Sequence, residues 1–373
     1  MLRRVDRSFF LGPGWPYLLV PFIPLAIILQ AADASDVAVF FTAALGIVPT
    51  ASLMSTATEE LAARAGPGIG GLLNVTFGNA PELIIALFAL GQGLHEVVKA
   101  TLVGSVMGNV LLVMGASMLF GGIGREKQTF DRTAANVQTT MLLVAAAAAA
   151  MPAVFQLVHG DPLPLPGDQH VSFGGTIEHL SLAISIVLIA TYAVGLFFSL
   201  KTHRRLFNPP DELAAEDQAL GWSVRQAVSM LAIAGIAVGI MSEVLVHSIT
   251  AASHTIGLSE FFIGAIIVAI VGNAAEHWVA VVVARKDKMD LSINIAIGSS
   301  AQIGLFVGPV LVIASFFIGP GPMPFVLNGL EVGAMLFAAL IANYVASEGE
   351  STWFEGAQLL AVYGLLALVF GFA

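Results

Sequence analysis

Two acidic residues, Glu82 and Glu276, lie inside apolar segments that are long enough to span a membrane, in the strings "GNAPELIIAL" (78–87) and "GNAAEHWVAV" (272–281). An ionisable side chain at membrane depth is costly when it contacts lipid, so it is expected to face an internal cavity and to have a task there. Each glutamate follows a Gly-Asn pair, and Pro81 removes a backbone hydrogen-bond donor from the first segment. We therefore predict that both segments are broken near the middle, which frees backbone carbonyl groups as ligands.

The two strings belong to an internal repeat. They align at a constant separation of 194 residues, and the same separation pairs Gly104-Ser105 with Gly298-Ser299 in the next apolar segment. A weaker similarity, at a separation of 184 residues, pairs Glu59 with Glu243. Unrelated packing motifs would not keep one register across two segments, so the pattern predicts two copies of one structural unit.

The polar atoms of the repeated motifs are carboxylate, amide, hydroxyl and carbonyl oxygens, which are the ligands of a hard cation. Calcium accepts six to eight oxygens in flexible geometry, whereas magnesium requires a rigid octahedron and retains its waters. Transition metals favour imidazole or thiolate, so zinc is disfavoured here. The predicted ligands are Glu82, Glu276, Asn79, Asn273, Gly78, Gly272, Ser105 and Ser299, and Ser300 adds a further hydroxyl.

The same pair of carboxylates predicts a second ion. Two acids that share a poorly hydrated site favour bound protons when no metal is present, and metal binding then expels those protons. A site that must hold either a metal or protons before it changes sides produces an antiporter.

Other polar residues of the apolar segments are candidates for the ion pathway: Glu59, Glu243, His247, Gln302, Asn109 and His277. Glu59 and Glu243 lie near the ends of their segments. They could line the entrance to the ion pathway or simply contact water, and the sequence favours neither. For Glu60 we expect contact with water. His247 follows Glu243 by one helical turn and could relay protons, whereas His277 could equally well be a packing residue.

The composition predicts the elements that hold these residues. Of the 373 residues, 57% are hydrophobic and 11% are charged, with a mean hydropathy of +0.89. Apolar runs of about 20 residues, each long enough to cross ~30 Å of hydrocarbon, recur along the chain. We predict an all-α membrane protein with eleven transmembrane helices near 15–31, 37–58, 69–90, 97–120, 135–158, 176–200, 223–251, 258–284, 290–318, 325–346 and 353–372. The chain contains no cysteine, which excludes disulfides and thiolate metal sites.

The distribution of charge predicts the orientation. Every lysine and arginine except Lys99 falls on one side of the predicted spans, so this side is expected to be cytoplasmic. The N-terminus is then cytoplasmic and the C-terminus outside. We expect a multi-pass protein of a bacterial or archaeal inner membrane.

The two copies of the repeat are predicted to run in opposite directions. The regions are an N-terminal segment with the first helix (1–33), a first five-helix repeat (34–200), a cytoplasmic acidic linker (201–221) and a second five-helix repeat (222–373). Inverted repeats are typical of secondary transporters, whose site lies near the midplane where the repeats meet. The linker is predicted to be either a solvated connection or a surface that attracts cations.

On these motifs, with "TEELA" and "SEVLVHSI" before them, the chain resembles the cation/proton exchanger family called CAX, within the calcium/cation antiporter superfamily. The resemblance covers nearly the whole chain. It implies exchange of cytosolic Ca²⁺ for protons, with Glu82 and Glu276 as sites shared by both ions. The chain departs from the family at two points. No long regulatory N-terminal extension like that of plant members is recognised, so autoinhibition by such a segment is not expected. His247 stands where some relatives have an acid, so the resemblance does not decide which residue relays protons on the outer side or how that relay depends on pH.

Other functions remain as alternatives. A sodium or potassium/proton antiporter could use the same two acids, although the Gly78-Asn79-Ala80 sequence differs from the Gly-Thr-Ser type motif of sodium/calcium exchangers and disfavours sodium coupling. A cation channel would need a continuous pore or a repeated filter, and neither is evident. We expect no enzymatic activity, no cofactor and no nucleic-acid partner. Ca²⁺ and protons are expected to be transported substrates, and the protein is expected to lie in a lipid bilayer. A homo-oligomer is compatible with the sequence.

Overall fold

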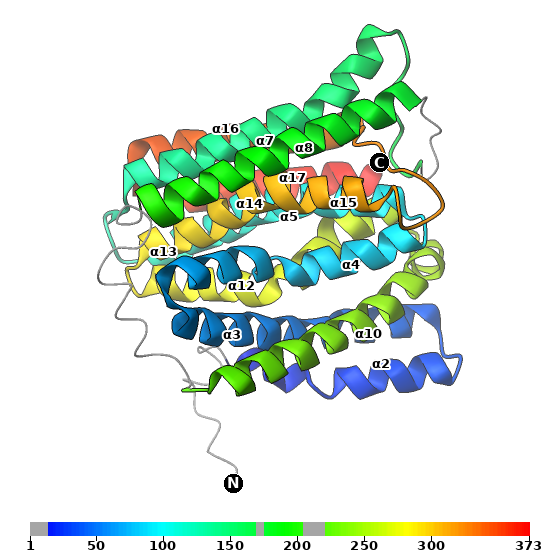
Figure 1. Cartoon of the computed structure of the whole chain (residues 1–373), viewed down its shortest axis with the longest axis horizontal. Helices are drawn as coiled ribbons and strands as arrows, with labels where there is room; N and C mark the ends of the chain where they lie inside the picture. Colours follow the sequence, from blue (N-terminus) through cyan, green and yellow to red (C-terminus); the bar gives the residue numbers. More distant parts are fainter. Residues whose placement is uncertain (1–13, 169–174, 204–220) are drawn as a thin grey trace.

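The computed structural model describes residues 14–168, 175–203 and 221–373, and the chain is almost entirely helical there (Figure 1). Because the apolar runs carry few charges, their backbone polar groups are paired within helices. The first half contains η1 (Trp15–Leu19), α2 (Phe22–Ala31), α3 (Asp36–Phe77), α4 (Ala80–Gly91), α5 (His95–Met107), η2 (Gly108–Val113), α6 (Met114–Gly122), β1 (Gln128–Thr129), α7 (Arg132–Val158), α8 (Gly175–Phe197) and η3 (Phe198–Thr202). The second half contains α10 (Val224–Ile256), α11 (Glu260–Phe262), η5 (Ile263–Val268), α12 (Ala269–Arg285), α13 (Met289–Ile293), η6 (Asn294–Gly298), α14 (Ser299–Gln302), η7 (Ile303–Val307), α15 (Gly308–Ala314), α16 (Gly329–Glu348), β2 (Glu350–Ser351) and α17 (Trp353–Phe372).

Within the described residues, nine helical stretches are long and apolar enough to cross a membrane. Two shorter apolar helices, Trp15–Ala31 and Ala80–Gly91, coincide with the other two predicted spans. The prediction of an all-α membrane protein is confirmed, and the count of eleven crossings stays a prediction. The predicted acidic linker lies almost entirely outside the described residues, because 204–220 are not among them.

Helix α3 reverses direction before it reaches the first Gly-Asn motif. A Cβ atom on Gly70 would lie 2.3 Å from the carbonyl oxygen of Ala62, although residues eight positions apart on a straight helix are separated by roughly 12 Å. Figure 1 shows the second part of α3 leading into α4. The sharp turn places the motif opposite the second repeat instead of extending it past the membrane.

The two motifs differ in backbone structure. In the first, α3 ends at Phe77 and α4 begins at Ala80, so the predicted break is present at Gly78-Asn79. In the second, α12 is continuous from Ala269 to Arg285. The predicted break at the second motif is therefore wrong, since no proline follows Asn273 and the regular i to i−4 hydrogen bonds are kept.

Several π-helical turns lie next to the motifs. Segment η2 (Gly108–Val113) and segment η7 (Ile303–Val307) occupy equivalent places in the two predicted repeats, 194 residues apart. Segment η5 lies directly before α12. Such turns are frequent at functional sites because they widen a helix and redirect its side chains, and the sequence pattern did not reveal them.

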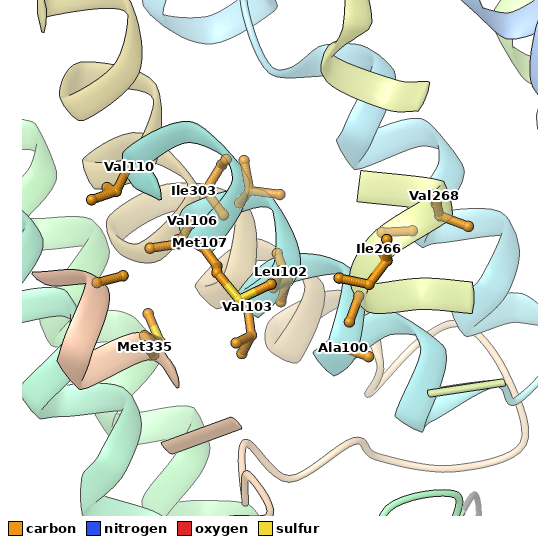
Figure 2. Close-up of a cluster of buried hydrophobic side chains, with 14 of the residues drawn as sticks. Ala100, Leu102, Val103, Val106, Met107, Val110, Ile266, Val268, Ile303 and Met335 are labelled. Atoms are coloured by element: carbon orange, nitrogen blue, oxygen red, sulfur yellow. The ribbon is translucent and has the colours of Figure 1, made fainter. Parts of the chain in front are cut away.

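Two groups of helices pack on each other. Helix α3 has its most extensive contacts with α10, and α2 covers α3; Figure 1 shows these three helices together along one side of the molecule. Helix α5 lies in the middle of the remaining helices, and nearly all of its residues are buried. Figure 2 shows the apolar side chains of α5 in contact with η5, η7 and α16.

The predicted cytoplasmic loops are also joined to each other. Strands β1 and β2 pair antiparallel, with Gln128 opposite Ser351 and Thr129 opposite Glu350. Lys127 donates a hydrogen bond of 2.6 Å to Glu350, which raises the pKa of the Lys127 ammonium. Both side chains are about half exposed, so this pair contributes little to stability.

Candidate functional site

The two glutamates of the repeated motifs reach across to each other's motif. A Cβ atom on Gly78 would lie 3.8 Å from Oε1 of Glu276, and a Cβ atom on Gly272 would lie 3.4 Å from Oε1 of Glu82. The carboxylates of Glu82 and Glu276 are close enough for their charges to interact. The two glycines thus leave room for the glutamate of the opposite motif. The region between the two acids is called the chamber below.

Two asparagine–serine pairs join the repeats around these acids. Ser299 Oγ donates a hydrogen bond of 2.7 Å to Asn79 Oδ1, and Asn273 Nδ2 donates one of 3.2 Å to Ser105 Oγ. The two pairs are equivalent under the separation of 194 residues, because Asn79 corresponds to Asn273 and Ser105 to Ser299. All four side chains are buried, at 8% exposure or less. The predicted ligand residues therefore meet at the junction of the two repeats.

Further polar side chains extend this network without matching partners in the other repeat. Asn79 Nδ2 donates to Gln302 Oε1 at 2.8 Å, and Asn109 Nδ2 donates to Ser299 Oγ at 3.2 Å. His277 Nε2 lies 3.0 Å from Asn109 Oδ1, so this histidine contacts the network. Ser300, in contrast, donates its hydroxyl proton to the carbonyl oxygen of Ala296 in its own helix, so its hydroxyl is committed to that helix.

Two buried oxygens in the chamber have no hydrogen-bond partner among the described residues: Oε2 of Glu82 and Oδ1 of Asn273. A buried acceptor without a donor is costly, and a cation satisfies it. Carboxylate and amide oxygens are ligands that suit Ca²⁺. Among the described residues, no group of three or more histidine, cysteine or acidic side chains is placed to hold a metal ion. A divalent cation bound here would have its charge balanced by two carboxylates, with neutral oxygens as its other ligands.

A cavity of about 480 Å³ adjoins this chamber. Its lining includes Glu59, Glu276, Asn79 and Gln302. The other lining residues come from η1, from the middle and the last turn of α3, from the first turns of α7, from the end of α8 with η3, from the middle of α12 and from the α13–α14 segment. The charge distribution predicts that η1, the start of α7, η3 and the start of α13 lie toward the cytoplasm.

The residues predicted for the opposite end lie elsewhere. Glu243 and His247 are one turn apart on α10 and are both exposed, but among the described residues the cavity lining does not include them. The expectation that Glu60 contacts water is wrong, because its side chain is 3% exposed and accepts a hydrogen bond of 3.1 Å from the backbone N–H of Trp222. This contact ties α3 to the start of α10.

The cavity contains residues that the sequence pattern did not single out. Ser52, Ser55 and Thr56 lie with Glu59 on one face of α3, at the helical spacing of three and four residues that could have identified this polar stripe. Trp15 and Trp278 also line the cavity and contact each other edge to face, with ring centroids 5.9 Å apart. They come from distant parts of the chain, so no local pattern predicts their meeting.

Comparison with known proteins identifies the family of the chain. The model of the family described as sodium/calcium exchanger protein matches residues 35–201 and 226–372. The chain is 41% identical over 369 residues to a Ca²⁺/H⁺ antiporter of Aphanothece halophytica, with 95% of each chain covered. It is 42% identical over 368 residues to the Ca²⁺/H⁺ antiporter ChaA of Bacillus subtilis (strain 168), with 98% of this chain and 99% of the relative covered. The solved structure of native YfkE superposes with a TM-score of 0.80 at 38% identity, over 96% of this chain and 100% of that chain. The chain is therefore a multi-pass helical membrane protein that belongs to the sodium/calcium exchanger protein family.

Proposed function

We propose that the chain exchanges cytosolic Ca²⁺ for protons by alternating access, with Glu82 and Glu276 as the groups that hold either ion. The observation that carries this proposal is the crossed contact of each glutamate with the glycine of the opposite motif. This observation supports a site built from two carboxylates, with the asparagine–serine pairs beside them, in which a divalent cation and protons would compete for the same oxygens.

The relatives support the choice of ions. Those of Aphanothece halophytica and Bacillus subtilis are named Ca²⁺/H⁺ antiporters and match this chain over nearly its full length. Glu59 lines the cavity that leads to Glu276, which favours a role in drawing cations toward the chamber. Enzymatic activity and a resident cofactor are not part of the proposal.

The proposal includes an orientation and a conformation. The N-terminus is cytoplasmic, and the two inverted repeats span 34–200 and 222–373, close to the segments 35–201 and 226–372 matched by the family model. Part of the cavity lining comes from η1, the start of α7, η3 and the start of α13, which are predicted to lie toward the cytoplasm. This supports a conformation that is open to the cytoplasm.

Transport in everted membrane vesicles tests the proposed ions. Vesicles with an acid interior are monitored with a pH-sensitive dye, and calcium, sodium or potassium is added outside, on the face that was cytoplasmic. We expect calcium to dissipate the pH gradient and sodium and potassium to have little effect, because two carboxylates match a divalent charge. Vesicles without the protein are the control.

The alternatives predict different outcomes of the same assay. A monovalent-cation/proton antiporter would respond to sodium or potassium, with calcium acting only as a competitor. A channel would let calcium enter without a coupled release of protons, so radioactive calcium uptake would proceed in vesicles that have no pH gradient and would follow the membrane potential instead.

The natural absence of cysteine allows a direct test of the cavity. Thr56 lines the cavity, so a cysteine placed there (Thr56→Cys) is expected to react with a membrane-impermeant thiol reagent in everted vesicles. It should react far less in right-side-out vesicles. Asp161→Cys is the matched control, because Asp161 is exposed after α7 and is predicted to face the opposite side. Labelling of both positions from the same side would contradict the proposed orientation.

A further inference from the structure

A second cluster of charged residues is buried away from the chamber. Glu96 and Lys99 lie at the start of α5, and Asn328 and Glu331 lie at the start of α16. Each of the four is 3% exposed or less. Glu96 precedes Ser105 by nine residues, which is roughly 14 Å along a helix. The cluster therefore lies toward the predicted outer end and joins the first half of the chain to the second.

The ammonium group of Lys99 is surrounded by oxygen atoms. Its Nζ lies 3.0 Å from Oε2 of Glu96 and donates a hydrogen bond of 3.2 Å to the carbonyl oxygen of Val326. Glu331 is close enough for its charge to interact with those of Glu96 and Lys99, and its Oε1 has no hydrogen-bond partner among the described residues. The set of two carboxylates and a backbone carbonyl is one that a hard cation also accepts.

Hydrogen bonds hold these oxygens in place. Asn328 Nδ2 donates to Glu96 Oε1 at 3.0 Å, and the backbone N–H of Asn328 donates to Glu331 Oε2 at 2.8 Å. Asn328 is also the N-cap of α16, where its side chain accepts from the backbone N–H of Glu331 at 2.9 Å. These hydrogen bonds hold both carboxylates in addition to the ion pair between Lys99 and Glu96.

The other repeat contains an equivalent place without a lysine. Glu96 corresponds to Asp290, and Lys99 corresponds to Ile293, at the separation of 194 residues. The backbone N–H of Asp131, the N-cap of α7, donates to Asp290 Oδ1, whereas the N-cap Asn328 donates to Glu96 from its side-chain Nδ2. Asp131 and Asp290 are both exposed, so water can screen the carboxylate. The lysine is present only in the copy from which water is excluded.

We propose that Glu96, Glu331 and the carbonyl of Val326 form a second cation site, which the Lys99 ammonium occupies permanently. A buried carboxylate requires a compensating charge, and the lysine ammonium is a compact charge on a flexible chain that can supply it. As a tethered cation, Lys99 links the two halves of the chain at this end and keeps mobile ions out of the site.

The substitution Lys99→Met tests this assignment, because it removes the charge and keeps most of the side-chain volume. It is made together with Glu82→Gln and Glu276→Gln, so that the transport chamber no longer contributes a calcium effect. In a calcium-free buffer with a large organic cation, we expect the midpoint of thermal unfolding to fall by roughly 5 to 10 °C relative to the Glu82→Gln/Glu276→Gln protein. Adding calcium should restore most of this loss, whereas the parent protein should show no response. Absence of a calcium-dependent recovery would overturn the proposal.

Three further variants separate a cation site from a general loss of stability. Lys127→Met removes an exposed lysine that pairs with Glu350 at 2.6 Å and should change the midpoint by about 1 °C or less. Lys99→Arg keeps the charge and should need no calcium. Glu96→Gln with Lys99→Met removes both charges and should be more stable than Lys99→Met alone when calcium is absent.

If Lys99→Met is too unstable for a melting curve, the yield of folded protein after solubilisation gives the answer. We expect calcium in the solubilisation buffer to raise that yield at least about twofold and to leave the yield of the Glu96→Gln/Lys99→Met protein unchanged. Equal yields of the single and double variants, with and without calcium, would mean that Lys99 has only a packing role.

Discussion

Replacing either Glu82 or Glu276 by glutamine is expected to abolish calcium-dependent dissipation of the pH gradient in everted vesicles. Glutamine keeps the shape of the side chain but removes one of the two negative charges and the group that carries the proton. The loss of one charged ligand weakens calcium binding by about 3 kcal/mol, or roughly 100-fold, and the remaining carboxylate cannot exchange two positive charges for protons. Initial rates should therefore fall below about a hundredth of the unsubstituted protein.

The matched control is Glu350→Gln, which makes the same chemical change at a side chain that is about half exposed in the β1–β2 contact. It should leave the transport rate unchanged. Vesicles must contain equal amounts of each variant, measured by immunoblot. Full calcium-dependent activity in Glu82→Gln or Glu276→Gln would remove the shared site from the mechanism and leave the fold without an assigned transport centre.

Gly104→Ala is expected to be the most destabilising small substitution in the core. A Cβ atom at this position would lie 1.9 Å from the carbonyl oxygen of Ala265 and 2.6 Å from its carbonyl carbon. Both obstacles belong to the backbone of η5, so α5 and η5 must move apart. Overpacking of this kind costs about 3 kcal/mol, which corresponds to a fall of roughly 5 °C in the midpoint of thermal unfolding.

The repeat supplies the control for this prediction, because Gly298 is the equivalent of Gly104. A Cβ atom on Gly298 would have no neighbour closer than 3.5 Å, and those neighbours are the side chains of Asn294 and Gln138. Gly298→Ala should therefore change the midpoint by about 2 °C or less, since alanine also favours the helix. Equal destabilisation by the two substitutions would show that the close approach of α5 and η5 is not maintained in the folded protein.

The sequence predicted much of the fold because the dominant physical signal is local. An apolar run of about 20 residues crosses a membrane whatever its neighbours are, so the helices lie where the hydropathy placed them. The reversal of α3 near Gly70 agrees with the interruption predicted between the spans 37–58 and 69–90, where Arg64, Pro67 and neighbouring glycines interrupt the apolar run. The sequence did not predict that the residues on both sides of the reversal would belong to one helical element, α3.

The polar residues of the chamber could be singled out because each lies in an apolar segment. The repeat also contains a matching residue, 194 positions later, for each of Glu82, Asn79 and Ser105. The break in the backbone was predicted by analogy for both motifs and occurs in only one. Pro81 forces it in the first copy, whereas the second copy has no residue that prevents a continuous helix. Sequence similarity between repeats therefore does not extend to the backbone when one copy contains a proline.

The sequence did not predict the buried cluster around Lys99, because each of its residues also fits a common local motif of helices. Glu96 and Lys99 are three residues apart, as in many surface ion pairs of helices. Asn328 and Glu331 form a capping box, which sequence alone would attribute to the start of a helix. Only the packing of α5 against α16 shows that these two local motifs exclude water together.

The crossed contacts of Glu82 with Gly272 and of Glu276 with Gly78 bear on how such a protein could have arisen. Neither half contains the whole proposed site, since each acid lies beside the glycine of the other half. A half-length ancestor inserted into the membrane in both directions would have formed the same chamber from two separate polypeptides. Gene duplication and fusion would then have needed no new chemistry, only a connection long enough to join the two subunits.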